Sequence, residues 1–404
     1  MRKNNLKYLK DIFVIGLTTF GGPQAHLARM LDLLVKKRNY FTEEEVLETY
    51  ALCQLLPGPG STQTITAISL KRGGVLLAIF SLLVWILPAV ILMSTVAVVL
   101  ALFERTKFDT SFLQFVQPMA IGFILFAGYK VSFKVIKNFS ALCIMVGATV
   151  VALFFSSVYS LPLIMLGGAV ISNFTNKQRS DKAFKNEKIN WRQSSFSLFL
   201  FLFLFAGVIA LSAIFVTPFT KMLENFYRFG SVTFGGGNVL VPMMFEQFVH
   251  YNHYMKANDF LSGLAMSQAV PGPSFAFATF AGGLSFSNPE VLGLGPQYVL
   301  LGCLVGTVCI FLPSILFVFF VFPFWGYLKH FRLIKRALEG INVAANGLVI
   351  AAAFILFRNM EFLYMNVAVI VATFLLLRFT KISAPVLVLI GLTSGFIYSH
   401  YFMA

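Results

Sequence analysis

The chain has 404 residues, of which 58% are hydrophobic and only 12% are charged, and its formal net charge is +15. A soluble domain needs about a quarter of its residues charged, so this composition excludes a water-soluble globule and indicates a chain that uses lipid as its solvent. The basic residues gather at the ends of apolar runs rather than in a stripe with interleaved aromatics, which favours membrane topology over nucleic-acid binding.

The chain begins with a basic segment, residues 1–10, and no small-residue cleavage site follows it, so no signal peptide is expected. Residues 8–20 predict a short helix that stops at Gly21 and Gly22, and Pro23 suits the first turn of a new helix. This helix is too short to span a bilayer.

A second short helix is expected near residues 43–56, where it stops at Pro57-Gly58-Pro59. Ser61 or Thr62 is expected to cap the helix that follows. Non-helical backbone at membrane depth must be buried in protein or line a watery cavity. These breaks are therefore expected to meet near the middle of the bilayer.

Nine apolar segments are long enough, or nearly so, to cross a membrane, and short Lys- and Arg-rich loops mark the cytoplasmic side. The expected spans are 75–103, 110–130, 139–156 and 160–175, then 196–216, then 297–322, 337–357, 362–378 and 383–401. Counting them gives a cytoplasmic N-terminus and an external C-terminus. The expected location is the plasma (inner) membrane of the cell.

An internal repeat organises the chain. Residues 16–24 align with 230–238 at an offset of 214, and the same offset aligns 54–61 with 268–275. The repeat predicts four parts: a first transporter repeat at 1–176, a basic cytoplasmic linker at 177–195, a connecting transmembrane helix at 196–216 and a second transporter repeat at 217–404. Because the single connecting helix reverses the second repeat, the expected fold class is an all-α polytopic membrane protein with two inverted repeats. Each repeat combines broken, re-entrant helices with about four long spans.

The four breaks predict an anion-binding site. Helix N-termini carry unpaired N–H groups and about half a positive charge, so several of them converging can hold an oxyanion. Hydroxyl and amide side chains beside the breaks can donate further hydrogen bonds. The candidate residues are Gly21, Gly22, Pro23, Gln24, His26, Arg29, Gln54, Pro57, Gly58, Pro59, Ser61, Thr62, Gly235, Gly236, Gly237, Asn238, Gln268, Pro271, Gly272, Pro273 and Ser274. The alternative is that Gly and Pro only shape turns and tight helix contacts.

Ionisable residues near the breaks have two interpretations. His26 and Arg29 lie one turn into the helix after Pro23, close enough to face the site, whereas solvated helix ends explain most of the other charges. His250 and His253 have metal-ligand spacing but no third ligand, and the four cysteines are scattered, so no metal site and no cofactor is expected.

Together, Phe20-Gly21-Gly22-Pro23, Pro57-Gly58-Pro59, Phe234-Gly235-Gly236-Gly237 and Pro271-Gly272-Pro273 resemble the long, two-domain form of the chromate ion transporter family over nearly the whole chain. The resemblance implies export of chromate driven by the proton motive force, with sulfate as the natural analogue. The implied partners are a small inorganic oxyanion and membrane lipid, with a homodimer left open and no nucleic acid.

Three functions compete. A secondary transporter comes first, because the chain has no phosphate-binding loop and no soluble nucleotide domain that would make ATP the energy source. A passive anion channel, or a transporter of another small anion, would share the same helix-end site. A membrane-embedded enzyme would need a nucleophile, a metal cluster or a cofactor motif, and the sequence offers none.

Overall fold

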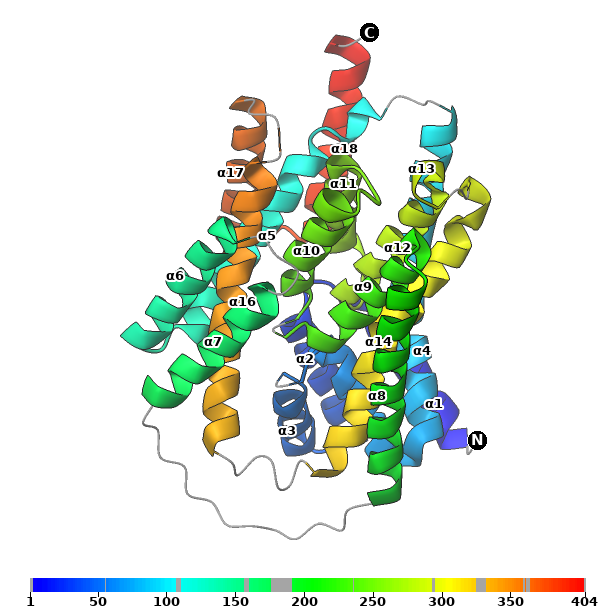
Figure 1. The fold of residues 1–404 in the computed structure, drawn as a ribbon, viewed down its shortest axis with the longest axis vertical. Coiled ribbons are helices and arrows are strands. Elements are labelled where there is room, and N and C mark those ends of the chain that lie inside the picture. The colour runs from blue at the N-terminus through cyan, green and yellow to red at the C-terminus, as the bar shows by residue number, and fades with distance from the viewer. Residues whose placement is uncertain are drawn as a thin grey trace.

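The computed structural model describes residues 3–54, 56–106, 110–155, 160–175, 191–234, 236–292, 295–324, 332–358, 360 and 364–402. Every regular element within these residues is a helix, which confirms the all-α prediction. Figure 1 shows an elongated bundle in which α1 and α8 begin toward the lower end and α18 ends at the top.

The first half of the chain contains short helices followed by long apolar ones. In order they are α1 (Lys3–Thr18), α2 (Pro23–Met30), the π-helix η1 (Leu31–Lys37), α3 (Glu43–Cys53), α4 (Gly60–Thr106), η2 (Ser111–Leu113), α5 (Val116–Val135), α6 (Phe139–Phe154) and α7 (Ser160–Thr175). The long helix α4 is broken at Gly73 and Gly74, where Gly74 has a φ of +79°. The predicted span 75–103 is therefore the second segment of α4.

Helix α8 (Trp191–Ile214) connects the halves, and the second half has a similar order in which several shorter helices stand in place of α4. It consists of α9 (Pro218–Val232), α10 (Gly237–Phe245), the π-helix η3 (Glu246–Tyr251), α11 (Ala257–Ala269), η4 (Ser274–Ala276), α12 (Phe277–Ser287), α13 (Pro289–Leu292), η5 (Pro296–Tyr298), α14 (Val299–Val321), η6 (Phe322–Phe324), α16 (Arg332–Arg358), α17 (Tyr364–Phe379) and α18 (Ala384–Phe402). Both halves thus have a π-helix directly after the short helix that follows the glycines.

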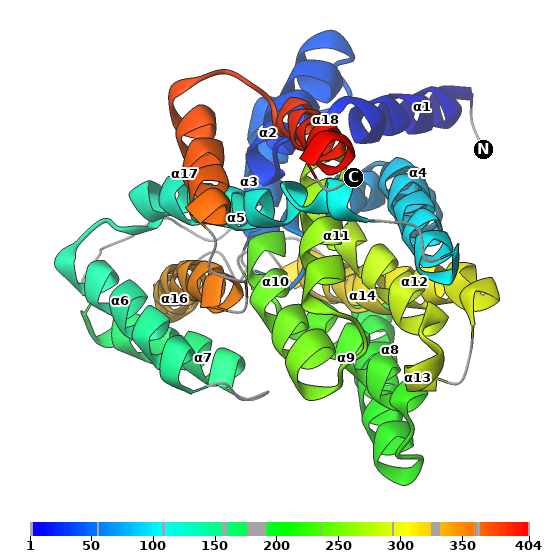
Figure 2. The ribbon, with the colours of Figure 1, turned by 90° about the horizontal axis from the view of Figure 1, so that it is seen from above.

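The membrane prediction is confirmed. Six helices in the described residues are long and apolar enough to cross a bilayer, and they include α8 and the C-terminal helix α18. The other predicted spans, α6, α7 and α17, are apolar helices of 16 residues each, or about 24 Å. Only 17% of the most apolar stretch of α8 is buried, and Figure 2 shows α8 at the edge of the bundle. Its outer face is therefore suited to contact lipid.

Equivalent glycines make equivalent contacts inside each half. A Cβ atom at Gly16 of α1 would lie 2.7 Å from the carbonyl oxygen of Trp85 in α4. A Cβ atom at Gly230 of α9 would press on the carbonyl oxygen of Ile310 in α14. Glycine lets these backbones approach closely, as is common between membrane helices. As a result, α1 packs on α4 as α9 packs on α14.

Helices of the two halves also pack against each other. Gly122 of α5 packs against Thr373 of α17, and Gly347 of α16 packs against Ala148 of α6. Figure 2 shows α5 beside α17 and α16 beside α6. Each central helix therefore supports the helical hairpin of the other half, so the two repeats form one interlocked body.

Candidate functional site

Two equivalent glycine corners start short helices. Gly22, with φ +82° and ψ −169°, precedes Pro23 at the start of α2, and Gly236, with φ +92° and ψ −171°, precedes α10. Only glycine adopts this backbone region without strain. Gly235 lies outside the described residues, as does the side chain of Asn238. Each corner leaves the first N–H groups of a helix without an intrahelical partner.

Two equivalent proline loops follow α3 and α11. Gly58 has a φ of +115° and Gly272 a φ of +102°. The first loop, residues 57–59, is buried throughout, whereas Gly272 in the second loop is half-buried. The helix after the first loop begins at Gly60, so the predicted cap at Ser61 or Thr62 is wrong and both residues lie within its first turn. The Pro59 carbonyl instead accepts the N–H of Gln63 at 2.9 Å.

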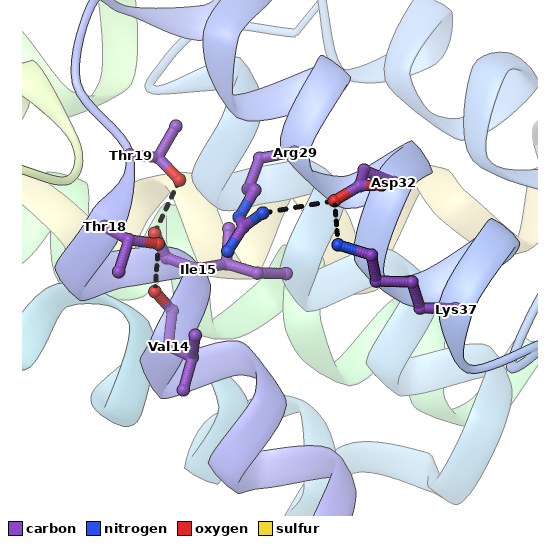
Figure 3. Close-up of polar contacts among 7 residues, drawn as sticks. All are labelled: Val14, Ile15, Thr18, Thr19, Arg29, Asp32 and Lys37. Atoms are coloured by element: carbon purple, nitrogen blue, oxygen red, sulfur yellow. Dashed lines mark hydrogen bonds and ion pairs between the residues drawn. The ribbon is translucent and has the colours of Figure 1, made fainter.

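Backbone hydrogen bonds join each loop to the corner of the other half. The Gly58 N–H donates to the Thr233 carbonyl oxygen at 2.7 Å, and the Gly272 N–H donates to the Thr19 carbonyl oxygen at 3.0 Å. Figure 3 shows Thr18 and Thr19 at the end of α1, where the Thr19 hydroxyl bonds back to the Ile15 carbonyl at 2.7 Å. Since α1 has ended, the carbonyl of Thr19 is available to the loop.

Contacts within each half complete a ring. In the first half, His26 Nδ1 lies 2.9 Å from the Ser61 hydroxyl oxygen, which links α2 to the helix after the proline loop. In the second half, a Cβ atom at Gly237 would lie 2.5 Å from Ser274 Cβ. The structure thus joins the two glycine corners and the two proline loops in one closed ring of contacts, so all four predicted breaks lie around one centre.

A polar cluster belongs to the first half alone. The His26 side chain is 1% exposed, its ring packs edge-on against Trp85, and the Trp85 indole N–H donates to the Thr62 hydroxyl at 3.1 Å. The His26 ring lies close to the backbone of Gly272, and its Nε2 has no hydrogen-bond partner among the described residues. His26 therefore points from the first glycine corner toward the second proline loop.

Two glutamines leave polar atoms without a protein partner beside the first proline loop. The Gln63 amide donates to the Pro57 carbonyl at 2.6 Å, but its Oε1 has no partner among the described residues. The same holds for Gln54 Nε2, which packs against Gly60. Buried polar atoms normally have a partner, so these two indicate a place for water or a bound ion.

Open space lies beside one glycine of each corner. A Cβ atom at Gly22 or at Gly236 would meet no heavy atom within 4 Å. By contrast, a Cβ atom at Gly58 would lie 2.8 Å from the Ser314 hydroxyl oxygen. The N-termini of α2 and α10 are therefore positions in the ring that a solute can approach.

Three of the predicted site residues, Arg29, Gln24 and Gln268, are at least partly exposed. Arg29 is half-exposed and binds Asp32 at 3.1 Å, as Figure 3 shows, so it faces a carboxylate rather than the ring. Gln24 is exposed, and Gln268 is half-buried on α11. Within the described part of the chain, no three His, Cys, Asp or Glu residues gather in a metal-binding group.

Sequence reasoning missed several participants. Thr19 and Thr233 contribute backbone carbonyls, which carry no signal of residue type. Trp85 and Ser314 come from the long helices α4 and α14. The Leu-Pro pairs at 87–88 and 312–313, which align at an offset of 225, were the available signal for this contact. Ser314 follows the second pair and lies against Gly58, and Ala89 follows the first pair and lies against Gly272.

Broken helices whose ends pair at the centre of a multi-pass bundle are typical of membrane transporters. The sequence profile of the chromate transporter family matches residues 6–172 and again residues 220–396, so the chain belongs to that family. It is a member of a family of anion transporters and not of enzymes.

Relatives of similar length support this assignment. The chain is 24% identical to a chromate transport protein of Cupriavidus metallidurans, over 96% of this chain and 92% of the relative. It is 23% identical to an uncharacterized transporter of Methanocaldococcus jannaschii, over 98% of this chain and 96% of the relative. A chromate transport protein of Pseudomonas aeruginosa is 24% identical over 83% of this chain and 76% of the relative. No solved structure matches the chain.

Proposed function

We propose that the protein is a secondary active transporter that exports a tetrahedral oxyanion, chromate or sulfate, across the plasma membrane, and that the proton motive force drives it. The ring of glycine corners and proline loops, open at Gly22 and Gly236, is the observation that carries this proposal.

The ring suits an oxyanion because it offers donors without a fixed charge. Two short helices begin at open glycines, so their first N–H groups can reach an anion directly. His26 Nε2 and Gln54 Nε2 supply further nitrogen atoms near the proline loops. A site built from dipoles holds an anion firmly enough for selectivity and releases it more readily than a site with a buried cation would.

The proposed topology has two inverted repeats, residues 1–176 and 217–404, separated by the linker 177–195 and the connecting helix 196–216. Figure 1 supports this arrangement, since α7 ends toward the lower side while its equivalent, α18, ends at the top. With basic loops inside, the N-terminus is cytoplasmic and the C-terminus external. The corners of the two repeats then reach the same depth from opposite faces of the bilayer. Whether two copies pair in the membrane stays a prediction.

Transport of labelled chromate, sulfate and phosphate into everted vesicles, with and without an imposed proton gradient, tests the proposal. We expect saturable uptake of chromate that rises with the gradient, competition by sulfate, and little uptake of phosphate. Flux that does not saturate and ignores the gradient would support the passive channel. Saturable uptake of a different anion would redirect the assignment of the substrate.

A further inference from the structure

The two repeats have a carboxylate at equivalent positions, but only the carboxylate of the first repeat forms ion pairs among the described residues. Asp32 and Glu246 are equivalent at the offset of 214, and each lies in the π-helix that follows its glycine corner. Asp32 binds Arg29 at 3.1 Å and Lys37 at 3.0 Å (Figure 3). It therefore carries a fixed, neutralised charge.

Glu246 lacks both of these cations. The residues equivalent to Arg29 and Lys37 are Met243 and Tyr251, neither of which carries a positive charge. Among the described residues, no side chain forms a hydrogen bond or an ion pair with the Glu246 carboxylate, although the side chain is half-buried. A carboxylate that no cation neutralises in partly buried surroundings is suited to take up and release a proton.

Glu246 also lines two small cavities. One, of about 20 Å³, is bordered by Arg228, Val232 and Gln247. The other, of about 10 Å³, is bordered by Phe155 and Ser160. Each volume is close to that of one water molecule, and Gln247 Nε2 is buried without a protein partner in the described structure, so a water has a donor beside the first cavity.

Both cavities border Glu246 and Leu161 at the start of α7, and each extends to a further element. The first reaches Val232, whose neighbour Thr233 accepts the hydrogen bond from the proline loop of the first half. The second reaches the end of α6 and the start of α7, which face outward in the proposed topology. Glu246 thus borders small cavities that extend both toward the ring and toward the external ends of α6 and α7.

Few charged groups face Glu246. Arg228 of α9 lies across the first cavity, but it already binds Glu224 at 3.0 Å and Asn225 at 2.5 Å. His250 follows one turn later on the same element and interacts electrostatically with Glu246. The described cavity-lining residues of α6, α7 and α16 are uncharged. Arg228 and His250 are therefore the groups that modulate proton binding at Glu246.

We propose that Glu246 is the proton-carrying residue of the transport cycle. Its carboxylate accepts a proton from water on the external side, the neutral acid crosses to the cytoplasmic side with the conformational change, and the proton leaves to water there while the oxyanion moves outward. This inference rests on the proposed function, because it needs transport that is coupled to protons.

The test uses Glu246→Gln, which mimics the protonated acid, in proteoliposomes. Two fluxes are measured: exchange of labelled for unlabelled chromate without a gradient, and chromate movement driven by a pH gradient together with proton flux from a pH-sensitive dye. We expect exchange within about twofold of wild type and a loss of at least about tenfold in both gradient-driven signals. Glu246→Asp should retain coupling. Glu44→Gln, which changes an exposed glutamate of α3, is the matched control and should behave as wild type.

Two results would overturn the proposal. Intact gradient-driven flux in Glu246→Gln would mean that the proton travels elsewhere. Loss of exchange together with coupling, while the variant keeps the wild-type elution profile, would mean that Glu246 serves the anion or the fold instead. Failure of the proposed function itself is separate, because the wild-type protein would then show no response to the pH gradient.

Discussion

The Gly58 N–H donates to the Thr233 carbonyl oxygen across 2.7 Å, and its repeat equivalent, from Gly272 to Thr19, spans 3.0 Å. Each bond joins a proline loop of one half to the glycine corner of the other. Both halves therefore form the centre of the protein, and a movement of one repeat against the other would change both of these hydrogen bonds.

Replacing Gly58 or Gly272 with leucine should abolish chromate resistance in cells that express the protein. Both glycines have a positive φ, which costs a larger residue about 1–3 kcal/mol. A side chain at Gly58 would also press on Ser314. Gly207→Leu is the control, since that position on α8 has open space. Immunoblots of membrane fractions should show all variants at similar levels, and full resistance in both loop variants would argue against a role for the loops.

His26→Leu should weaken chromate binding. The leucine at the equivalent position, Leu240, indicates that the fold accepts this side chain. Loss of a hydrogen bond to a charged ligand is worth about 1.5 kcal/mol or more, so the KM for chromate should rise about tenfold. The control is His400→Leu at the C-terminal end of α18. An unchanged KM with a lower unfolding temperature would limit His26 to a structural role.

The linker 177–192 should be cytoplasmic and the loop near 288–296 external. Cysteines introduced one at a time at Ser180 and Asn288, in a background with all four native cysteines replaced by serine, test this. A membrane-impermeant thiol reagent added to intact cells should label position 288 and spare position 180. The opposite labelling pattern would reverse the topology.

Gly168→Val should destabilise the protein, while its neighbour Gly167→Val should not. A Cβ atom at Gly168 would lie 2.7 Å from the Gly340 carbonyl oxygen, whereas one at Gly167 meets nothing within 4 Å. Overpacking of this kind costs about 1–3 kcal/mol. The thermal midpoint of the purified protein, followed by size-exclusion chromatography, should fall for Gly168→Val alone. Equal midpoints for the two variants would mean that α7 and α16 separate at little cost.

Much of the fold could be predicted from the sequence because its main signals are local. Long apolar runs give the spans, and the Gly and Pro breaks recur at an offset of 214. The π-helices η1 and η3 could not be predicted in this way, since their shifted hydrogen bonds follow from packing rather than from residue type.

The candidate site was only partly predictable for a similar reason. His26 and Arg29 lie on one helix, three residues apart, and the sequence predicts that both lie close enough to face the site. The structure separates them, because Ser61 and Trp85 of α4 enclose His26 while Asp32 draws Arg29 outward. Such a distinction depends on neighbours that are distant in the sequence.

Equilibrium binding of chromate to the purified protein, measured by isothermal titration calorimetry, tests the central claim most directly. Gly22→Val and Gly236→Val fill the open space at the two glycine corners, and Gly147→Val adds the same side chain where α6 has room. We predict that wild type and Gly147→Val bind chromate alike and that each corner variant loses at least about tenfold in affinity. Unchanged affinity in both corner variants would contradict a site at the N-termini of α2 and α10.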